Sequence, residues 1–182
     1  MNLLELASKI GVEGFLHCDE LEKLVELAVN CDVLEVGSYR GLSAWGMAIV
    51  ARSLTCVDTF CAATDGQRQT DEVTTFDAFQ IAVSRYNHVT SIMQASEGAA
   101  RIVGAWPRNK DFDVVFLDAM HTYEEVLADI DRWWPRLRPG GLFVMHDYRH
   151  ADFPGVEKAA DERFGPAPEG TTLVTLRWIE KT

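Results

Sequence analysis

The sequence predicts an α/β fold with a doubly wound, mostly parallel sheet and helices on both of its faces. The main observation is that short apolar runs of strand length alternate with amphipathic stretches from residue 32 onward. The predicted strands are 32–37, 53–58, 89–94, 112–118 and 141–147. The predicted helices between them are 42–51, 76–86, 96–105 and 123–134. Strands that alternate with helices form βαβ units, whose parallel sheet is covered on both faces.

Two further helices are expected before this core. Apolar residues recur at helical spacing over 3–10, and the pattern Asp19-x-x-Glu22 predicts a capping box at the start of a second helix. Residues 1–30 are therefore expected to form N-terminal helices, and residues 31–182 the α/β core.

The C-terminal third carries clear turn and helix signals. "RPGG" at 138–141 predicts a turn before the last parallel strand. Pro154 suits the first position of a helix, which is expected to end near Gly165. The alternating run 171–181 predicts an antiparallel last strand at the edge of the sheet.

Composition limits the classes of function. A chain of 182 residues with 47% hydrophobic residues can bury one substantial core, so a single domain over residues 1–182 is expected. A net charge of −11 without a basic cluster argues against a nucleic-acid partner and favours a small-molecule substrate. No segment approaches the roughly 18 apolar residues that cross a bilayer, so a cytoplasmic protein without a membrane partner is expected. The N-terminal helices could mediate a homodimer.

The segment after the first predicted strand suits a nucleotide-like cofactor. Gly37 ends the strand and Gly41 begins the next helix, so the cofactor can approach the backbone there. Asp58 follows the second strand about 20 residues further on, where an acid can bind ribose hydroxyls. A dinucleotide fingerprint would require glycine at Tyr39, and a nucleophile elbow is absent because Ser38 directly follows Gly37. A purely structural glycine turn remains the alternative.

Acidic and imidazole side chains follow two neighbouring predicted strands. Asp118 and His121 come after 112–118, and His146 and Asp147 end 141–147. Ligands of a doubly wound sheet bind beyond the carboxyl ends of its strands, so these groups should meet at one edge. They suit Mg²⁺, Mn²⁺ or another divalent ion, although a histidine at a strand end is often only a structural residue.

Several stretches resemble class I S-adenosylmethionine (SAM)-dependent methyltransferases: "VLEVGSYRG", "CVDTF", "LRPGG" and "FLDAMHTYEEVLADIDRWWPRLRPGGLFVMHDY". The last is most similar to the small O-methyltransferase branch, which includes catechol-type and macrolide-sugar enzymes. The resemblance covers roughly residues 30–165 and implies a Rossmann-like methyltransferase fold.

The resemblance also implies how the cofactor is bound. Glu35 would lie under the methionine amino group, and the turn from Gly37 through Ser38 to Gly41 would wrap the amino-acid end of SAM. Asp58 with Thr59 would hold the ribose. The turn at Ala95-Ser96 would border the adenine, although Ser96 could equally be a helix N-cap.

The sugar enzymes of this branch carry an Asp-x-x-His segment that supplies a metal ligand and a general base, and Asp118 and His121 match it. Asp118 could also orient the cofactor without a metal. The family has two acids after the fifth strand, whereas this chain has His146-Asp147. Either His146 is a ligand, which favours Mn²⁺, Fe²⁺ or Zn²⁺, or only Asp118 and Asp147 bind the ion.

The expected activity is methyl transfer from SAM to a hydroxyl of a sugar or natural-product intermediate, with His121 taking the proton. A metal-dependent hydrolase or hydroxylase that uses the Asp and His residues is one alternative, and a non-catalytic SAM-binding module is another. The polar stretch 59–76 is a candidate lid, in which Phe60 would touch the cofactor and Arg68 an anionic substrate. His150 is expected in a solvated loop, with a ligand or substrate contact as the alternative.

Overall fold

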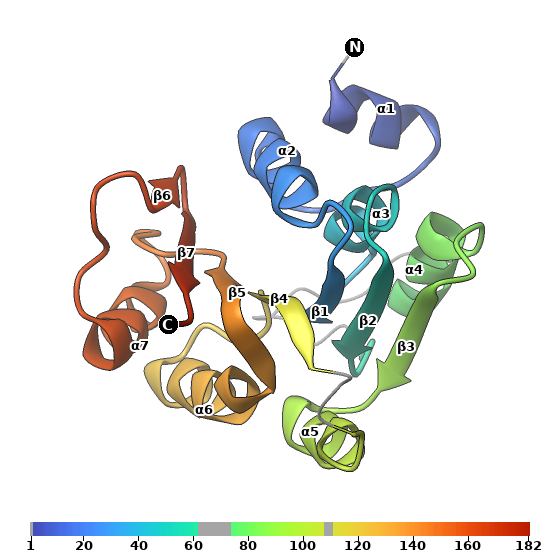
Figure 1. The fold of residues 1–182 in the computed structure, drawn as a ribbon. Coiled ribbons are helices and arrows are strands. Elements are labelled where there is room, and N and C mark those ends of the chain that lie inside the picture. Colours follow the sequence, from blue (N-terminus) through green and yellow to red (C-terminus); the bar gives the residue numbers. More distant parts are fainter. Residues whose placement is uncertain (1, 62–73, 108–110) are drawn as a thin grey trace.

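The computed structural model describes residues 2–61, 74–107 and 111–182 (Figure 1). Its sheet has seven strands in the order β3-β2-β1-β4-β5-β7-β6. The first five strands pair in parallel, and the last two are antiparallel. The bounds are β1 Asp32–Val36, β2 Ser53–Asp58, β3 Val89–Met93, β4 Phe112–Leu117, β5 Leu137–Met145, β6 Thr172–Leu173 and β7 Leu176–Glu180.

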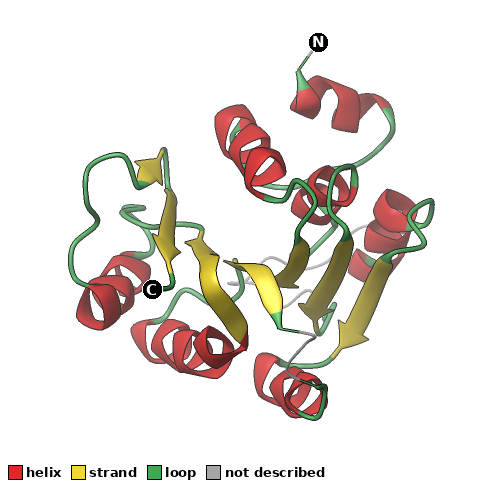
Figure 2. Ribbon diagram, viewed as in Figure 1, coloured by secondary structure: helices red, strands yellow, loops and turns green. Residues whose placement is uncertain are grey.

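Helices cover both faces of this sheet (Figure 2). One buried cluster of apolar side chains lies between the sheet and α1–α4, and a second lies between the sheet and α5–α7. The bounds are α1 Leu3–Lys9, α2 Cys18–Leu27, α3 Leu42–Ala48, α4 Thr75–Val83, α5 Ser96–Gly104, α6 Tyr123–Trp133 and α7 Pro154–Phe164, with a short 3-10 helix at Trp134–Arg136. The predicted fold class is confirmed.

The central strand β1 shows why apolar residues fill whole strands in such a sheet. Leu34 and Val36 contribute to the cluster under α5–α7, whereas Val33 contributes to the cluster under α1–α4. Strand β1 pairs with β2 on one side and β4 on the other. The strand order therefore reverses beside β1, and a ligand crevice is expected beyond the ends of β1 and β4.

The "RPGG" segment is not a turn before β5, as the sequence predicted, but lies inside this strand. Its backbone finds partners in the C-terminal tail: the Gly140 N–H donates to the Lys181 carbonyl at 2.6 Å, and the Lys181 N–H donates to the Gly141 carbonyl at 2.9 Å. Pairing with β4 shifts register between Phe112 and Val114 at the same level. Distant backbone partners thus override the local turn signal.

Two other expectations are corrected. The run 171–181 is a hairpin of β6 and β7, so the antiparallel pairing with β5 is confirmed but the sheet edge is the two-residue strand β6. The capping box of α2 joins His17 and Glu20, not Asp19 and Glu22. None of the helices in the described part of the chain has the length and apolar character needed to cross a bilayer.

Candidate active site

A cavity of about 460 Å³ opens beyond the carboxyl ends of β1, β4 and β5. Its lining comes from four segments of the chain: the N-terminal segment 14–16, the turn and helix start at 37–43, and the two strand exits at 118–121 and 146–153. The expectation that the glycine turn and the Asp and His groups meet at one sheet edge is therefore met by the geometry.

Gly37 brings the ends of β1 and β4 together. Its φ angle is +93°, and a Cβ atom there would lie 2.0 Å from the carbonyl oxygen of Asp118. Only glycine allows both this backbone conformation and this approach. The residue thus fixes the position of Asp118 relative to the turn that lines the cavity.

Glu35 supports this turn from inside the protein. Its side chain is fully buried, and its carboxylate accepts hydrogen bonds from the hydroxyls of Ser38 and Ser43. Burial raises its pKa to about 7, against the lowering effect of those hydroxyls. Glu35 is not among the residues that line the cavity but lies beneath Ser38 and Ser43, which do. Ser38 and Gly41 do line it.

Asp58 organises the same turn from the neighbouring strand. One of its carboxylate oxygens accepts from the backbone N–H groups of Ser38 and Tyr39, both at 2.8 Å, and the other accepts from the N–H of Phe60 at 2.7 Å. Thr59 beside it is exposed, and its hydroxyl accepts from the N–H of Cys61. The two residues lie at the end of β2, outside the cavity lining.

Ser96 does not act as an N-cap, because that position belongs to Ala95. Its hydroxyl donates to Asp129 and accepts from the indole of Trp133, so it ties α5 to α6. Its side chain is thus directed to α6 and does not line the cavity.

Asp118, His121 and Asp147 form one cluster on the cavity wall, which we call the Asp/His cluster. Each offers a ligand atom, and these atoms lie within 4.8 Å of one another. Nε2 of His121 lies 3.0 Å from Oδ2 of Asp147. The His121 ring also stacks on Phe153, with ring centroids 4.1 Å apart. Carboxylate oxygens and imidazole nitrogen fit a divalent cation such as Mg²⁺ or Mn²⁺.

His146 has carboxylate partners at both of its ring nitrogens. Its Nδ1 lies 3.2 Å from Asp118 and 3.3 Å from Asp147, and its Nε2 lies 3.3 Å from Glu20. Burial lowers the pKa of His146, but the three carboxylates outweigh burial and raise it far above its usual range. Both ring nitrogens therefore face carboxylates, and His146 lies at the cavity wall between Glu20 and the two aspartates.

The carboxylates respond to the same contacts. Burial raises the pKa of Asp147, yet hydrogen bonds from His121 and His146 bring it below its usual range. Burial likewise opposes ionisation of Glu20, but hydrogen bonds from His146, Thr175 and the His17 backbone lower its pKa. The contacts with His146 thus favour the ionised forms of Asp147 and Glu20.

No sequence motif marks Glu20, Phe15, Leu16 or Phe153 as residues of the site. The last three line the cavity. His150 also lines it and stacks on Phe153, with ring centroids 5.0 Å apart, so it is not merely a solvated loop residue. Phe60 is buried against Phe76 and Phe79 of α4. Arg68 and most of the candidate lid lie outside the described residues.

These features agree with a family model described as a methyltransferase domain, which matches residues 34–148, more than half of the chain. The chain belongs to this methyltransferase family. The resemblance to class I methyltransferases is thereby confirmed. No curated protein matches this methyltransferase in sequence.

Solved structures share the fold of this methyltransferase. CalS11, a TDP-rhamnose 3'-O-methyltransferase of calicheamicin biosynthesis, is similar with a TM-score of 0.64 at 16% identity, covering 89% of this chain and 76% of its own. An O-methyltransferase from Bacillus cereus in complex with SAH is similar with a TM-score of 0.62 at 14% identity, over 88% and 76%. MycE of the mycinamycin pathway, in complex with Mg and SAH, gives 0.58 at 19% identity, over 100% and 55%.

Proposed function

We propose that this methyltransferase transfers the methyl group of SAM to a hydroxyl oxygen of a small molecule, a sugar or natural-product intermediate, with the help of a divalent cation. The observation that carries the proposal is one cavity that is lined by both the glycine turn and the Asp/His cluster. A methyl donor and a hydroxyl-activating group can then face each other within a single site.

The cofactor would be held by the turn that Glu35 and Asp58 organise. Gly37, Ser38 and Gly41 would contact its amino-acid end, because these residues line the cavity. Asp58 and Thr59 at the end of β2, and the backbone at Ser96, would hold its adenosine end, as in the enzymes that the motifs resemble. Relatives of the same fold have been solved with SAH bound, which supports this assignment.

Asp118 and Asp147 would hold the cation, and His121 would remove the proton of the acceptor hydroxyl. When bound, a divalent cation supplies Lewis-acid chemistry that lowers the pKa of the acceptor hydroxyl. His121 is oriented for proton transfer by Asp147 on its edge and Phe153 on its face. This division of roles follows from His146 being held between Glu20 and the two carboxylates.

Calorimetric titration with SAM, followed by turnover of methyl-labelled SAM against a panel of hydroxylated metabolites, tests the proposal. We expect SAM to bind, and turnover to rise with Mg²⁺ or Mn²⁺ and fall in EDTA. Absence of SAM binding would favour a metal-dependent hydrolase or hydroxylase. Binding without turnover on any acceptor would favour a non-catalytic module, and full activity in EDTA would remove the cation from the mechanism.

A further inference from the structure

Glu20 is a fully buried acid on α2, a helix that precedes the methyltransferase core. One carboxylate oxygen accepts from the N–H and the hydroxyl of Thr175, at 2.8 and 2.7 Å. The other accepts from the N–H of His17 at 2.9 Å and faces Nε2 of His146 at 3.3 Å. Four donors thus surround the two oxygens, so the carboxylate has one fixed orientation.

That orientation determines the orientation of His146. The imidazole is only 8% exposed, and Nε2 points to Glu20, so Nδ1 must point to the opposite side. On that side lie Asp118 at 3.2 Å and Asp147 at 3.3 Å. One buried ring therefore contacts both carboxylates to which we assign the cation.

The chain supplies these groups from distant segments. Glu20 comes from α2, Thr175 from the turn between β6 and β7, and His146 from the end of β5. The contact between Glu20 and His146 spans 126 positions, and that between Glu20 and Thr175 spans 155. Helix α2 and the hairpin of β6 and β7 thus meet next to His146.

We propose that Glu20 and His146 are positioning residues: Glu20 fixes the ring of His146, and His146 holds Asp118 and Asp147 in the arrangement that receives the cation. The inference rests on the proposed function and deepens it. In this role both residues would act through the two aspartates, with Glu20 outside the cavity lining and His146 at its wall.

Such positioning would favour cation binding because the two carboxylates would already be in place before the cation arrives. Two carboxylates close together repel each other, and each would otherwise adopt other rotamers. A hydrogen-bond donor behind metal-binding carboxylates reduces this freedom, and loss of such a partner typically weakens metal binding by about 10–100-fold. The Glu20–His146 pair has the placement required for that role.

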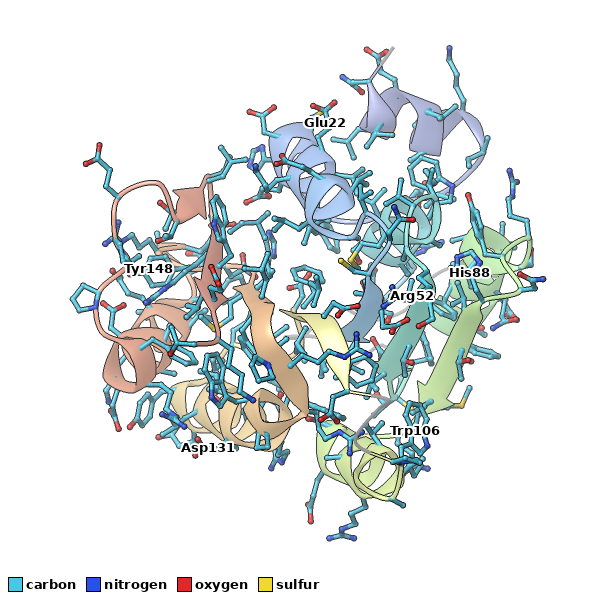
Figure 3. All side chains as sticks on the ribbon, viewed as in Figure 1. Glu22, Arg52, His88, Trp106, Asp131 and Tyr148 are labelled. Carbon is cyan, nitrogen blue, oxygen red and sulfur yellow. The ribbon has the colours of Figure 1, made fainter. Side chains whose placement is uncertain are left out.

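Mn²⁺ titration of the cofactor-free protein tests the inference independently of turnover. We expect Glu20→Gln to weaken Mn²⁺ binding by about tenfold or more, while the affinity for SAM stays within about twofold. The matched control is Glu22→Gln, an exposed acid on the same helix that Figure 3 labels, and it should bind Mn²⁺ like the wild type.

A second comparison covers the possibility that Glu20→Gln does not fold. Thr175→Val removes one hydroxyl donor from Glu20 but keeps the carboxylate, so it should weaken Mn²⁺ binding in the same direction by a smaller factor. His146→Gln should weaken Mn²⁺ binding by the same factor as Glu20→Gln. The double variant should weaken it no further than either single variant, because the two residues act in series. Thermal melting confirms that each protein tested is folded.

The outcomes separate the two proposals. Unchanged Mn²⁺ affinity in folded Glu20→Gln, or in folded Thr175→Val if Glu20→Gln does not fold, would overturn the positioning role while leaving the cation site intact. Additive losses in the double variant would overturn the serial arrangement. A wild-type protein that binds SAM but no Mn²⁺ would overturn both this role and the cation in the proposed function.

Discussion

At the scale of single residues, Glu35 links stability to pH. Its pKa in the folded protein is about 7, against a usual 4.5, because burial disfavours the charged form. Between these two values the unfolded chain releases a proton that the folded protein keeps, so the free energy of unfolding falls as pH rises. The loss attributable to Glu35 is about 3 kcal/mol between pH 4.5 and 7.

Glu35→Gln should remove this dependence. We expect its stability relative to the wild type to improve steadily from pH 4.5 to 7 in the cofactor-free protein, because the amide does not titrate. Chemical denaturation of both proteins at several pH values measures the difference. Parallel pH profiles would show that Glu35 ionises in the fold as it does in water.

His121 is the residue to which we assign removal of the acceptor proton. His121→Ala should lower turnover by about a hundredfold or more, the usual contribution of a general base, and should leave SAM affinity nearly unchanged. His88→Gln is the control, since His88 bonds to the Ala48 carbonyl away from the cavity. Loss of Mn²⁺ binding in His121→Ala would instead make His121 a metal ligand.

Replacement of Gly37 by any other residue should destabilise the turn after β1. Gly37→Ala combines an unfavourable φ of +93° with a contact of 2.0 Å to the Asp118 backbone. The cost should be on the order of 3 kcal/mol, a fall in Tm of roughly 10 °C. Gly104→Ala, where a Cβ meets nothing within 4 Å at the end of α5, should not lower Tm. Equal Tm values for the two variants would contradict this account.

At the scale of elements, α7 packs closely against the backbone of the segment that carries His121. A Cβ at Gly155, in its first turn, would lie 2.5 Å from the His121 carbonyl and 2.6 Å from the Tyr123 nitrogen. The helix cannot easily slide away, because Asp161 binds Arg177 of β7 at 2.6 Å and Tyr148 at 2.9 Å (Tyr148 is labelled in Figure 3).

Gly155→Ala should therefore displace the segment 121–123 and lower turnover by about 10–100-fold, since small displacements of reacting groups are costly. The fall in Tm should be smaller than for Gly37→Ala, because Gly155 has no positive φ. Steady-state kinetics with Gly104→Ala as control would check it. Normal kinetics in Gly155→Ala would mean that the loop adjusts without moving His121.

The elements also show what sequence can and cannot predict. The five parallel strands and the helices between them follow from apolar periodicity, which depends only on local spacing. The prediction of a turn at "RPGG" was wrong, because the backbone of this segment forms hydrogen bonds with the C-terminal tail around Lys181. The prediction of a single strand over 171–181 was wrong, because the segment is a hairpin of β6 and β7. Its turn at Thr175 contains no glycine or proline, so the apolar periodicity does not reveal it.

The same division holds for the candidate site. Asp118, His121 and Asp147 could be predicted, because they follow adjacent strands and the carboxyl ends of parallel strands share one edge. Glu20 could not, because its contact with His146 depends on how α2 packs against the finished sheet. Its role as a capping-box residue of α2 is visible only once the start of that helix is known.

At the scale of the whole molecule, the cavity brings together segments that lie far apart in the sequence. It is lined by the N-terminal segment 14–16, the turn after β1 and the exits of β4 and β5, so a bound cofactor would stabilise all of them together. Binding to the folded state alone stabilises a protein by about 2.7 kcal/mol when the ligand is at 100 times its Kd. For a chain of this length that is a rise in Tm of roughly 5–10 °C.

We therefore expect SAH at 100 times its Kd to raise Tm by roughly 5–10 °C, measured by differential scanning calorimetry. NAD at the same concentration should leave Tm unchanged, because Tyr39 stands where a dinucleotide fingerprint requires glycine. The rise should shrink in Gly37→Ala at the same SAH concentration, since the altered turn binds the cofactor less tightly. A rise with NAD as large as with SAH would mean that the glycine turn accepts dinucleotides, and the cavity would then need a different cofactor assignment.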